Sequence, residues 1–235
     1  MRSGPGHPAW NMALDEALLE AHAPGDPPVL RLYAWAPAGL SLGRFQPAAE
    51  VELPPGAALV RRPSGGAAIH HREDEVTYAL VARYERFGSP RAAYEAVHAA
   101  VAAGLVALGV PLAPRARPDE AAGRHGLCYA RATGYDLVVG ASKLVGSAQR
   151  RSGRAFLQHG SIPLSADPLV PSATSLSELL GHAPDPEQVA TELLASFERR
   201  LGFSARLDQP TPDELARAER LLRERYATPA WTHAL

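Results

Sequence analysis

Apolar side chains recur at helical spacing in four parts of the chain. The first begins at Pro8, a residue suited to the opening turn of a helix, and stops before the Pro24–Gly25 break. The second, residues 91–108, is rich in alanine, glycine and valine, so we expect it to pack closely against a sheet and to contribute no chemistry. Residues 186–201 and 215–226 carry apolar stripes on otherwise polar segments and predict two more helices.

Between these helices, short segments of alternating apolar and polar residues predict β-strands. They cover residues 29–35, 39–43, 59–62, 67–71, 76–83, 135–139, 142–150 and 155–162. The last two flank Ser152 and Gly153 and predict a hairpin. The order of helix, strands, long helix, strands and helices predicts an α+β fold with a mixed, largely antiparallel β-sheet flanked by helices. No linker or internal repeat interrupts it, so we expect a single domain over residues 1–235 without an accessory C-terminal domain.

Composition narrows the class of protein. The net charge is −1, which gives no reason to expect a nucleic-acid partner. The longest apolar run, residues 99–113, is shorter than the roughly 20 residues that span a bilayer, and no signal peptide precedes it. We therefore expect a soluble, cytoplasmic protein with no membrane partner. A single cysteine excludes an intramolecular disulfide and any multi-cysteine zinc site.

One lysine, Lys143, stands among the 24 basic residues, and it lies fifteen positions after the single cysteine, Cys128. Lysine can lose its proton when it is desolvated, whereas arginine stays charged, so a lone lysine suggests a task that a guanidinium cannot perform. A nearby ammonium also favours the thiolate form of a cysteine. The alternatives are a surface lysine retained by chance and an inert buried thiol.

A second candidate site is the turn that follows Arg61 and Arg62. Ser64, Gly65 and Gly66 let a ligand approach the backbone closely, and successive N–H groups can bind an anion or a carbonyl oxygen. The segment lacks the Gly-Lys-Ser/Thr of a phosphate-binding loop. The alternative is an ordinary turn with no ligand, since such turns often have the same residues.

The histidines that follow, His70 and His71, are adjacent on a predicted strand. Adjacent strand residues point to opposite faces, so the two should not share a metal ion. We expect one of them to face a pocket.

These segments together resemble the biotin/lipoate protein ligase A/B superfamily. The resemblance rests on RRPSGGAAIHH, on KLVGSAQ from Lys143, on LQHGS from Leu157, on the N-terminal NMALDEALL and on the terminal YATPAW. Its cysteine-dependent octanoyltransferase branch matches best, because Cys128 precedes the lysine at that branch's spacing. The resemblance implies the biotin/lipoate ligase catalytic-domain fold, Cys128 as acyl acceptor and Lys143 as the residue that lowers the pKa of Cys128. It also implies a substrate-binding set of Arg62, Ser64, Gly65, Gly66, Ala67, His71, Gly146, Ser147, His159 and Gly160.

The same resemblance implies the partners. The donor would be an octanoyl-acyl carrier protein, and the acceptor a lipoyl-carrier protein, either a glycine cleavage H protein or a dehydrogenase E2 lipoyl domain. No cofactor or metal is expected. An ATP-dependent lipoate–protein ligase, which would need ATP and Mg²⁺, and a non-catalytic acyl-binding protein remain alternatives.

The sequence departs from the family at two positions near the turn. Arg72 follows His71 where the family usually has an acidic residue, and Ala67 stands where a larger residue is common. Because acyl carrier proteins are acidic, we also expect arginines near the catalytic stretch to steer the donor. The candidates are Arg115, Arg117, Arg124, Arg131, Arg150, Arg151 and Arg154.

Overall fold

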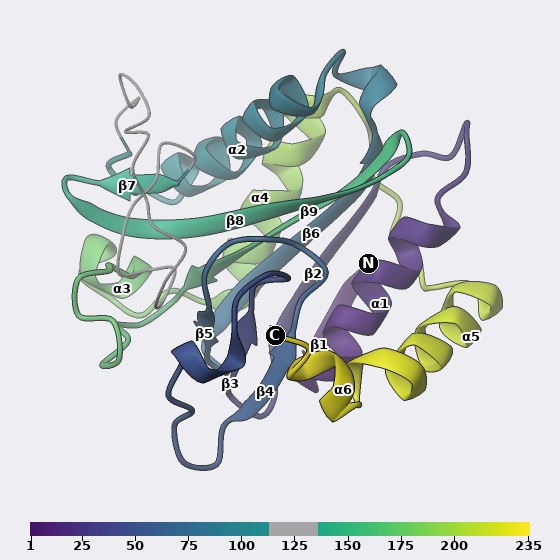
Figure 1. The fold of residues 1–235 in the computed structure, drawn as a ribbon. Helices are drawn as coiled ribbons and strands as arrows, with labels where there is room; N and C mark the ends of the chain where they lie inside the picture. The colour runs from purple at the N-terminus through teal and green to yellow at the C-terminus, as the bar shows by residue number, and fades with distance from the viewer. Residues whose placement is uncertain (113–135) are drawn as a thin grey trace.

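The computed structural model describes residues 1–112 and 136–235 (Figure 1). Its strands are β1 (Arg2–Gly6), β2 (Val29–Trp35), β3 (Gly39–Leu42), β4 (Ala58–Arg61), β5 (Ile69–His71), β6 (Glu75–Arg83), β7 (Leu137–Val139), β8 (Ser142–Ser152) and β9 (Ala155–Pro163). Its helices are α1 (Pro8–Ala21), α2 (Pro90–Ala107), α3 (Leu176–Leu180), α4 (Pro186–Leu201), α5 (Pro212–Leu221) and α6 (Pro229–Thr232). Short 3₁₀ turns form at η1 (Ala48–Glu50) and η2 (Tyr84–Arg86), and a π-helical turn, η4 (Leu222–Tyr226), continues α5.

The large sheet has six strands in the order β1-β2-β6-β9-β8-β7, and a smaller sheet has the order β4-β3-β5. β1 pairs in parallel with β2 and β3 with β4, whereas the remaining neighbours are antiparallel. The predicted α+β class and the predicted β8–β9 hairpin are both confirmed. The four helices predicted from periodicity form α1, α2, α4 and α5.

Helices cover both faces of the large sheet, as Figure 1 shows. Strand β6 explains the division, because its side chains alternate between two separate cores. Tyr78 and Leu80 pack with α2 and α4 on one face, and Ala79 and Val81 pack with α1 and α5 on the other. No helix within the described ranges is both long and apolar enough to cross a membrane.

Strand β1 was not predicted, because its sequence, RSGPG, lacks an apolar alternation. It forms at the edge of the sheet through pairing with β2, and the Met1 ammonium donates to the carbonyl oxygen of Leu30 at 2.8 Å. Helix α3 was also missed, since it is short. Ser175 and Glu178 close its first turn as a capping box.

Candidate functional site

A mostly apolar pocket lies where the two sheets meet α1. It encloses about 280 Å³, open solvent at its mouth included. We call it the central pocket. It is lined by Met12, Tyr33, Trp35, Ser41, Arg62, Ile69, His71, Thr77, Ala148, His159, Gly160 and Ser161.

His159 links the glycine turn to the first helix through buried hydrogen bonds. Its Nε2 lies 2.6 Å from the Ser64 Oγ, and its Nδ1 lies 3.3 Å from Oδ2 of Asp15. A carboxylate can only accept, so Nδ1 carries the proton, and the Nε2 of a neutral imidazole accepts from the Ser64 hydroxyl. Ser64 and Asp15 are almost fully buried. The arrangement fixes both the imidazole and the turn.

Asp15 is also half of a buried ion pair. Arg31 Nη1 lies 2.8 Å from Oδ1 of Asp15, and the Tyr33 hydroxyl donates to Oδ2 at 2.9 Å. Burial alone would raise the pKa of Asp15, but the hydrogen bond from His159 and the charge of Arg31 bring its pKa below the ordinary value. Ser64, His159 and Asp15 thus have the connectivity of a catalytic triad. Because Arg31 and Tyr33 share its carboxylate, Asp15 chiefly holds the pocket together.

His71 presents a neutral imidazole to the central pocket. Its Nδ1 lies 2.8 Å from Oε1 of Glu75, its Nε2 lies 2.8 Å from Oγ of Ser41, and its ring stacks on Trp35 with centroids 3.7 Å apart. Burial lowers the pKa of His71, although Glu75 opposes that shift. The family usually has an acidic residue directly after His71, where this chain has Arg72. The acidic partner of His71 is instead Glu75, four residues later.

The arginines before the glycine turn bind backbone carbonyl oxygens. Arg62 donates to the carbonyl oxygens of Ser41, Gly65 and Ala67 at 2.7 to 2.8 Å. Arg61 donates in the same way to those of Gly43, Gln46 and Thr232. The guanidinium of Arg62 therefore shapes the turn from within, whereas that of Arg61 joins the loop after β3 to the C-terminal segment.

Glycine is required where the turn meets its neighbours. Gly66 has a φ of +94°, which favours glycine. A Cβ on Gly43 would lie 1.7 Å from the carbonyl oxygen of Gly66. In β9, a Cβ on Gly160 would lie 2.5 Å from Oγ of Ser147. These close approaches hold the turn and the two strands β8 and β9 at their observed spacing.

The single lysine lies in a buried ion pair. Lys143 Nζ is 2.9 Å from Oδ1 of Asp136, with side-chain exposures of 1% and 4%. The carbonyl oxygen of Lys143 accepts from Thr174 N at 3.0 Å, which ties the start of β8 to the loop before α3. Asp136 was not predicted. Its signal was an acid at the head of the otherwise apolar segment DLVV.

His98, on the helix expected to carry no chemistry, lies within the electrostatic reach of Lys143. Burial and the charge of Lys143 lower the pKa of His98 to about 4. Its ring packs on Tyr94 with centroids 4.6 Å apart, and within the described residues its Nε2 has no hydrogen-bond partner.

The remaining predicted site residues fall in three places. Cys128 lies outside the described residues. Gly146 and Ser147 are on β8 and do not line the central pocket, and Ser147 instead bonds Tyr78 through Oγ at 2.7 Å. Its neighbour Ala148 lines the pocket. The structure brings together Arg62, Ser64, His71, His159 and Gly160 around the pocket, with Gly65, Gly66 and Ala67 in the adjoining turn.

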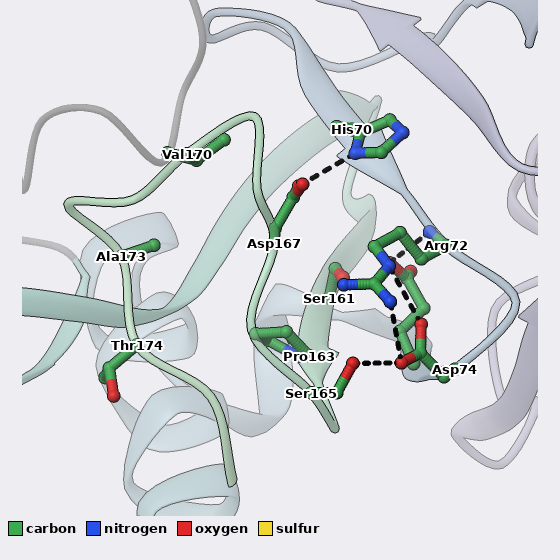
Figure 2. A pocket seen from close by; sticks show the side chains of 11 residues that line it. His70, Arg72, Asp74, Ser161, Pro163, Ser165, Asp167, Val170, Ala173 and Thr174 are labelled. Atoms are coloured by element: carbon green, nitrogen blue, oxygen red, sulfur yellow. Dashed lines mark hydrogen bonds and ion pairs between the residues drawn. The ribbon is translucent and has the colours of Figure 1, made fainter. Parts of the chain in front are cut away.

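The neighbouring histidine faces a different, more polar pocket (Figure 2). His70 Nδ1 lies 2.8 Å from Oδ2 of Asp167, and Arg72 pairs with Asp74 on the same wall. His70 and His71 thus point into separate pockets, as strand alternation predicts. Within the described residues, no group of three or more histidine, cysteine, aspartate or glutamate side chains could hold a metal ion.

Comparison with known proteins agrees with this geometry. Two curated relatives are octanoyltransferases LipM. That of Kyrpidia tusciae is 36% identical over 99% of this chain and 97% of its own, and that of Moorella thermoacetica is 36% identical over 97% and 95%. A crystal structure of lipoate-protein ligase A bound with ATP superposes with a TM-score of 0.81 at 23% identity, covering 100% of this chain and 97% of that one. The bi-partite lipoate protein ligase of Thermoplasma acidophilum, analysed with its E2 lipoyl domain, has the same TM-score at 22% identity, covering 100% and 94%.

These two structures share the fold, and the family follows from sequence. Residues 7–170 match the family model described as the lipoyl protein ligase A/B catalytic domain. That range covers well over half of the chain and includes every predicted site residue. The chain therefore belongs to the lipoyl protein ligase A/B catalytic domain family.

Proposed function

We propose that this enzyme transfers an octanoyl group from an acyl carrier protein to a lysine of a lipoyl-carrier protein, through a thioester on Cys128. The observation that carries the proposal is the central pocket, whose walls are largely Met12, Trp35, Ile69 and other apolar groups. The pocket's histidines are bonded to protein partners, so the lining suits an unbranched hydrocarbon chain. Relatives named octanoyltransferase match nearly the whole chain, which favours an eight-carbon acyl group.

The proposed reaction has two balanced steps. The Cys128 thiolate attacks the carbonyl carbon of the donor thioester, the bond to the carrier's sulfur breaks, and the leaving thiolate takes a proton from the Lys143 ammonium. The target lysine's neutral amine then attacks the Cys128 thioester. The Cys128 thiolate leaves, and the proton released by the amine returns to Lys143. Asp136 holds Nζ of Lys143 in place through both steps.

No nucleotide is required by this scheme. Exchange of one thioester for another is near thermoneutral, and conversion of a thioester to an amide is downhill. We therefore propose that the enzyme uses neither ATP nor a metal ion. We also propose that it works in the cytoplasm, where a lone thiol stays reduced.

The test is a transfer assay without nucleotide. Octanoyl-acyl carrier protein and an unmodified E2 lipoyl domain are mixed with the enzyme, and intact-mass spectrometry follows both proteins. We expect an octanoyl adduct on the enzyme and then on the lipoyl domain. Transfer that occurs only from free octanoate with ATP and Mg²⁺ would support a ligase. Octanoyl binding with no transfer from either donor would support a non-catalytic protein.

A further inference from the structure

Two arginines share the indole ring of the C-terminal motif. The guanidinium carbon of Arg44 lies 4.3 Å from the centroid of the Trp231 ring, and that of Arg225 lies 4.8 Å from the same centroid. Trp231 Nε1 donates to the carbonyl oxygen of Arg61 at 2.8 Å, which fixes the ring. The indole face attracts each cation, but two cations held on one ring also repel each other. A bound anion would relieve that repulsion.

A third arginine adds to the same field. Burial lowers the pKa of Arg44, and the positive charges of Arg150 and Arg225 lower it further. Glu16 opposes them, but its carboxylate is already bonded to Arg225 at 2.6 Å and to the Tyr226 hydroxyl. Positive charge therefore outweighs negative charge around Arg44. We call Arg44, Arg150 and Arg225 the arginine cluster.

The arginine cluster adjoins the central pocket. Arg44 N donates to the carbonyl oxygen of Ser64 at 2.8 Å, so the loop after β3 rests on the glycine turn. Arg150 lies two positions after Ala148 on β8, and this spacing puts both on one face of the strand. Phe45, next to Arg44, is 69% exposed. A donor that reaches the central pocket past the loop after β3 would meet the arginine cluster and the exposed Phe45.

We infer that the arginine cluster binds the phosphate of the phosphopantetheine arm that presents the octanoyl thioester. The inference rests on the proposed function and adds how the donor is recognised. The guanidiniums of Arg44 and Arg225 meet at the Trp231 ring, and the charge of Arg150 acts on Arg44 from β8. Planar guanidinium forks match the oxygens of a phosphate. An acidic helix of the carrier protein would instead be matched by a row of cations. Phe45 follows Arg44 directly and is exposed, so the uncharged part of the arm would find an apolar side chain in the same loop.

Two small donors measure the contribution of the phosphate alone. Octanoyl-pantetheine and octanoyl-phosphopantetheine carry the same thioester and differ only in the phosphate. We expect the wild-type enzyme to use the phosphorylated donor with a kcat/KM roughly tenfold higher or more, the scale of charge-assisted hydrogen bonds. The double variant Arg44→Gln/Arg150→Gln should bring the two donors within about twofold, by losing activity on the phosphorylated one alone. Arg225 is left intact because it holds Glu16.

Arg199→Gln is the control, because it removes the same charge from an exposed side chain at the end of α4, which packs on the other face of the large sheet. It should keep the wild-type donor ratio. If the double variant unfolds, Arg150→Gln alone should still lower the ratio. Equal use of both donors by the wild type, or an unchanged ratio in the variants, would overturn the inference while octanoyl transfer stands. Failure of both small donors and of octanoyl-acyl carrier protein would instead reject the proposed function, and the inference with it.

Discussion

Two of the buried ion pairs are built from different cations. Asp15 and Arg31 join α1 to β2, and the carboxylate is shared with Tyr33 and His159. Lys143 and Asp136 join β8 to the residue before β7, eight positions after Cys128 in the sequence. Arginine keeps its proton under all ordinary conditions, whereas a buried lysine can release one.

We propose that the first pair positions the pocket and that the second takes part in the chemistry. The Asp15–Arg31 pair is tied by hydrogen bonds to both sides of the central pocket, so it can hold the pocket in shape but has no proton to transfer. In the proposed reaction, the Lys143–Asp136 pair supplies the group that acts as an acid and then as a base. Four predictions test this division, in order of decreasing expected effect.

The first asks whether Ser64, rather than Cys128, carries the acyl group, since Ser64, His159 and Asp15 have the connectivity of a catalytic triad. We expect Cys128→Ala to lose transfer by roughly 10⁴-fold or more, the scale of removing a nucleophile. Ser64→Ala should still form the acyl-enzyme, although the turn loses its bond to His159. Intact-mass spectrometry with octanoyl-acyl carrier protein distinguishes them. An octanoyl adduct on Cys128→Ala that disappears when Ser64 is also replaced would reverse the assignment.

The second concerns the lysine of the other pair. Lys143→Arg keeps the charge but removes proton transfer, so we expect the transfer rate to fall by roughly 10²–10⁴-fold. The pH dependence of Cys128 alkylation should change less, since a positive charge is retained. Lys143→Ala provides the comparison, because it loses both. A Lys143→Arg enzyme within about threefold of the wild type in rate would leave Lys143 as a simple counter-charge.

The third concerns the positioning pair. Asp15→Asn leaves Arg31 buried beside a neutral group, and we expect unfolding free energy to fall by about 3–5 kcal/mol in urea titrations. The control, Asp208→Asn, breaks an exposed pair with Arg206 and should leave the unfolding free energy close to that of the wild type.

The Asp15 contribution also has a predictable pH dependence. Because the pKa of Asp15 is lowered on folding, its stabilisation is fully present above the unfolded pKa of about 4 and is lost as the pH falls through the folded value. Asp15→Asn should lack that component. A variant as stable as the wild type near neutral pH would show that the pair is not needed to hold the pocket.

The fourth concerns His98, whose pKa drops from 6.5 to about 4 on folding. In the unfolded chain, His98 binds a proton below pH 6.5, whereas in the folded chain it does so only below about pH 4. The unfolding free energy therefore decreases by about 3 kcal/mol as the pH is lowered from 6.5 to 4. His98→Leu should flatten that part of the stability curve, leaving the slope from His71 and His22, whose pKa values are also lowered. Urea titrations between pH 4 and 7 measure it. An unchanged slope would mean that His98 is not buried as a neutral group.

The periodicity of the sequence and the order of its motifs were enough to predict several elements of the fold and the family. Spacing alone placed α1, α2, α4, α5 and the β8–β9 hairpin, because amphipathic repeats report which side of an element is buried. Strand alternation also separated His70 from His71. The rarity of one lysine drew attention to Lys143, since residue choice at a single position is visible without any structure.

Tertiary structure decided which groups meet. Asp15 and His159 lie 144 residues apart, and they become partners only because α1 packs on β9. Asp136 and Glu75 were missed for the same reason, as acids whose partners are chosen by strand pairing. The guanidiniums of Arg61 and Arg62 turned toward carbonyl oxygens because a buried charge must be hydrogen-bonded, and the nearest acceptors were backbone groups of neighbouring segments.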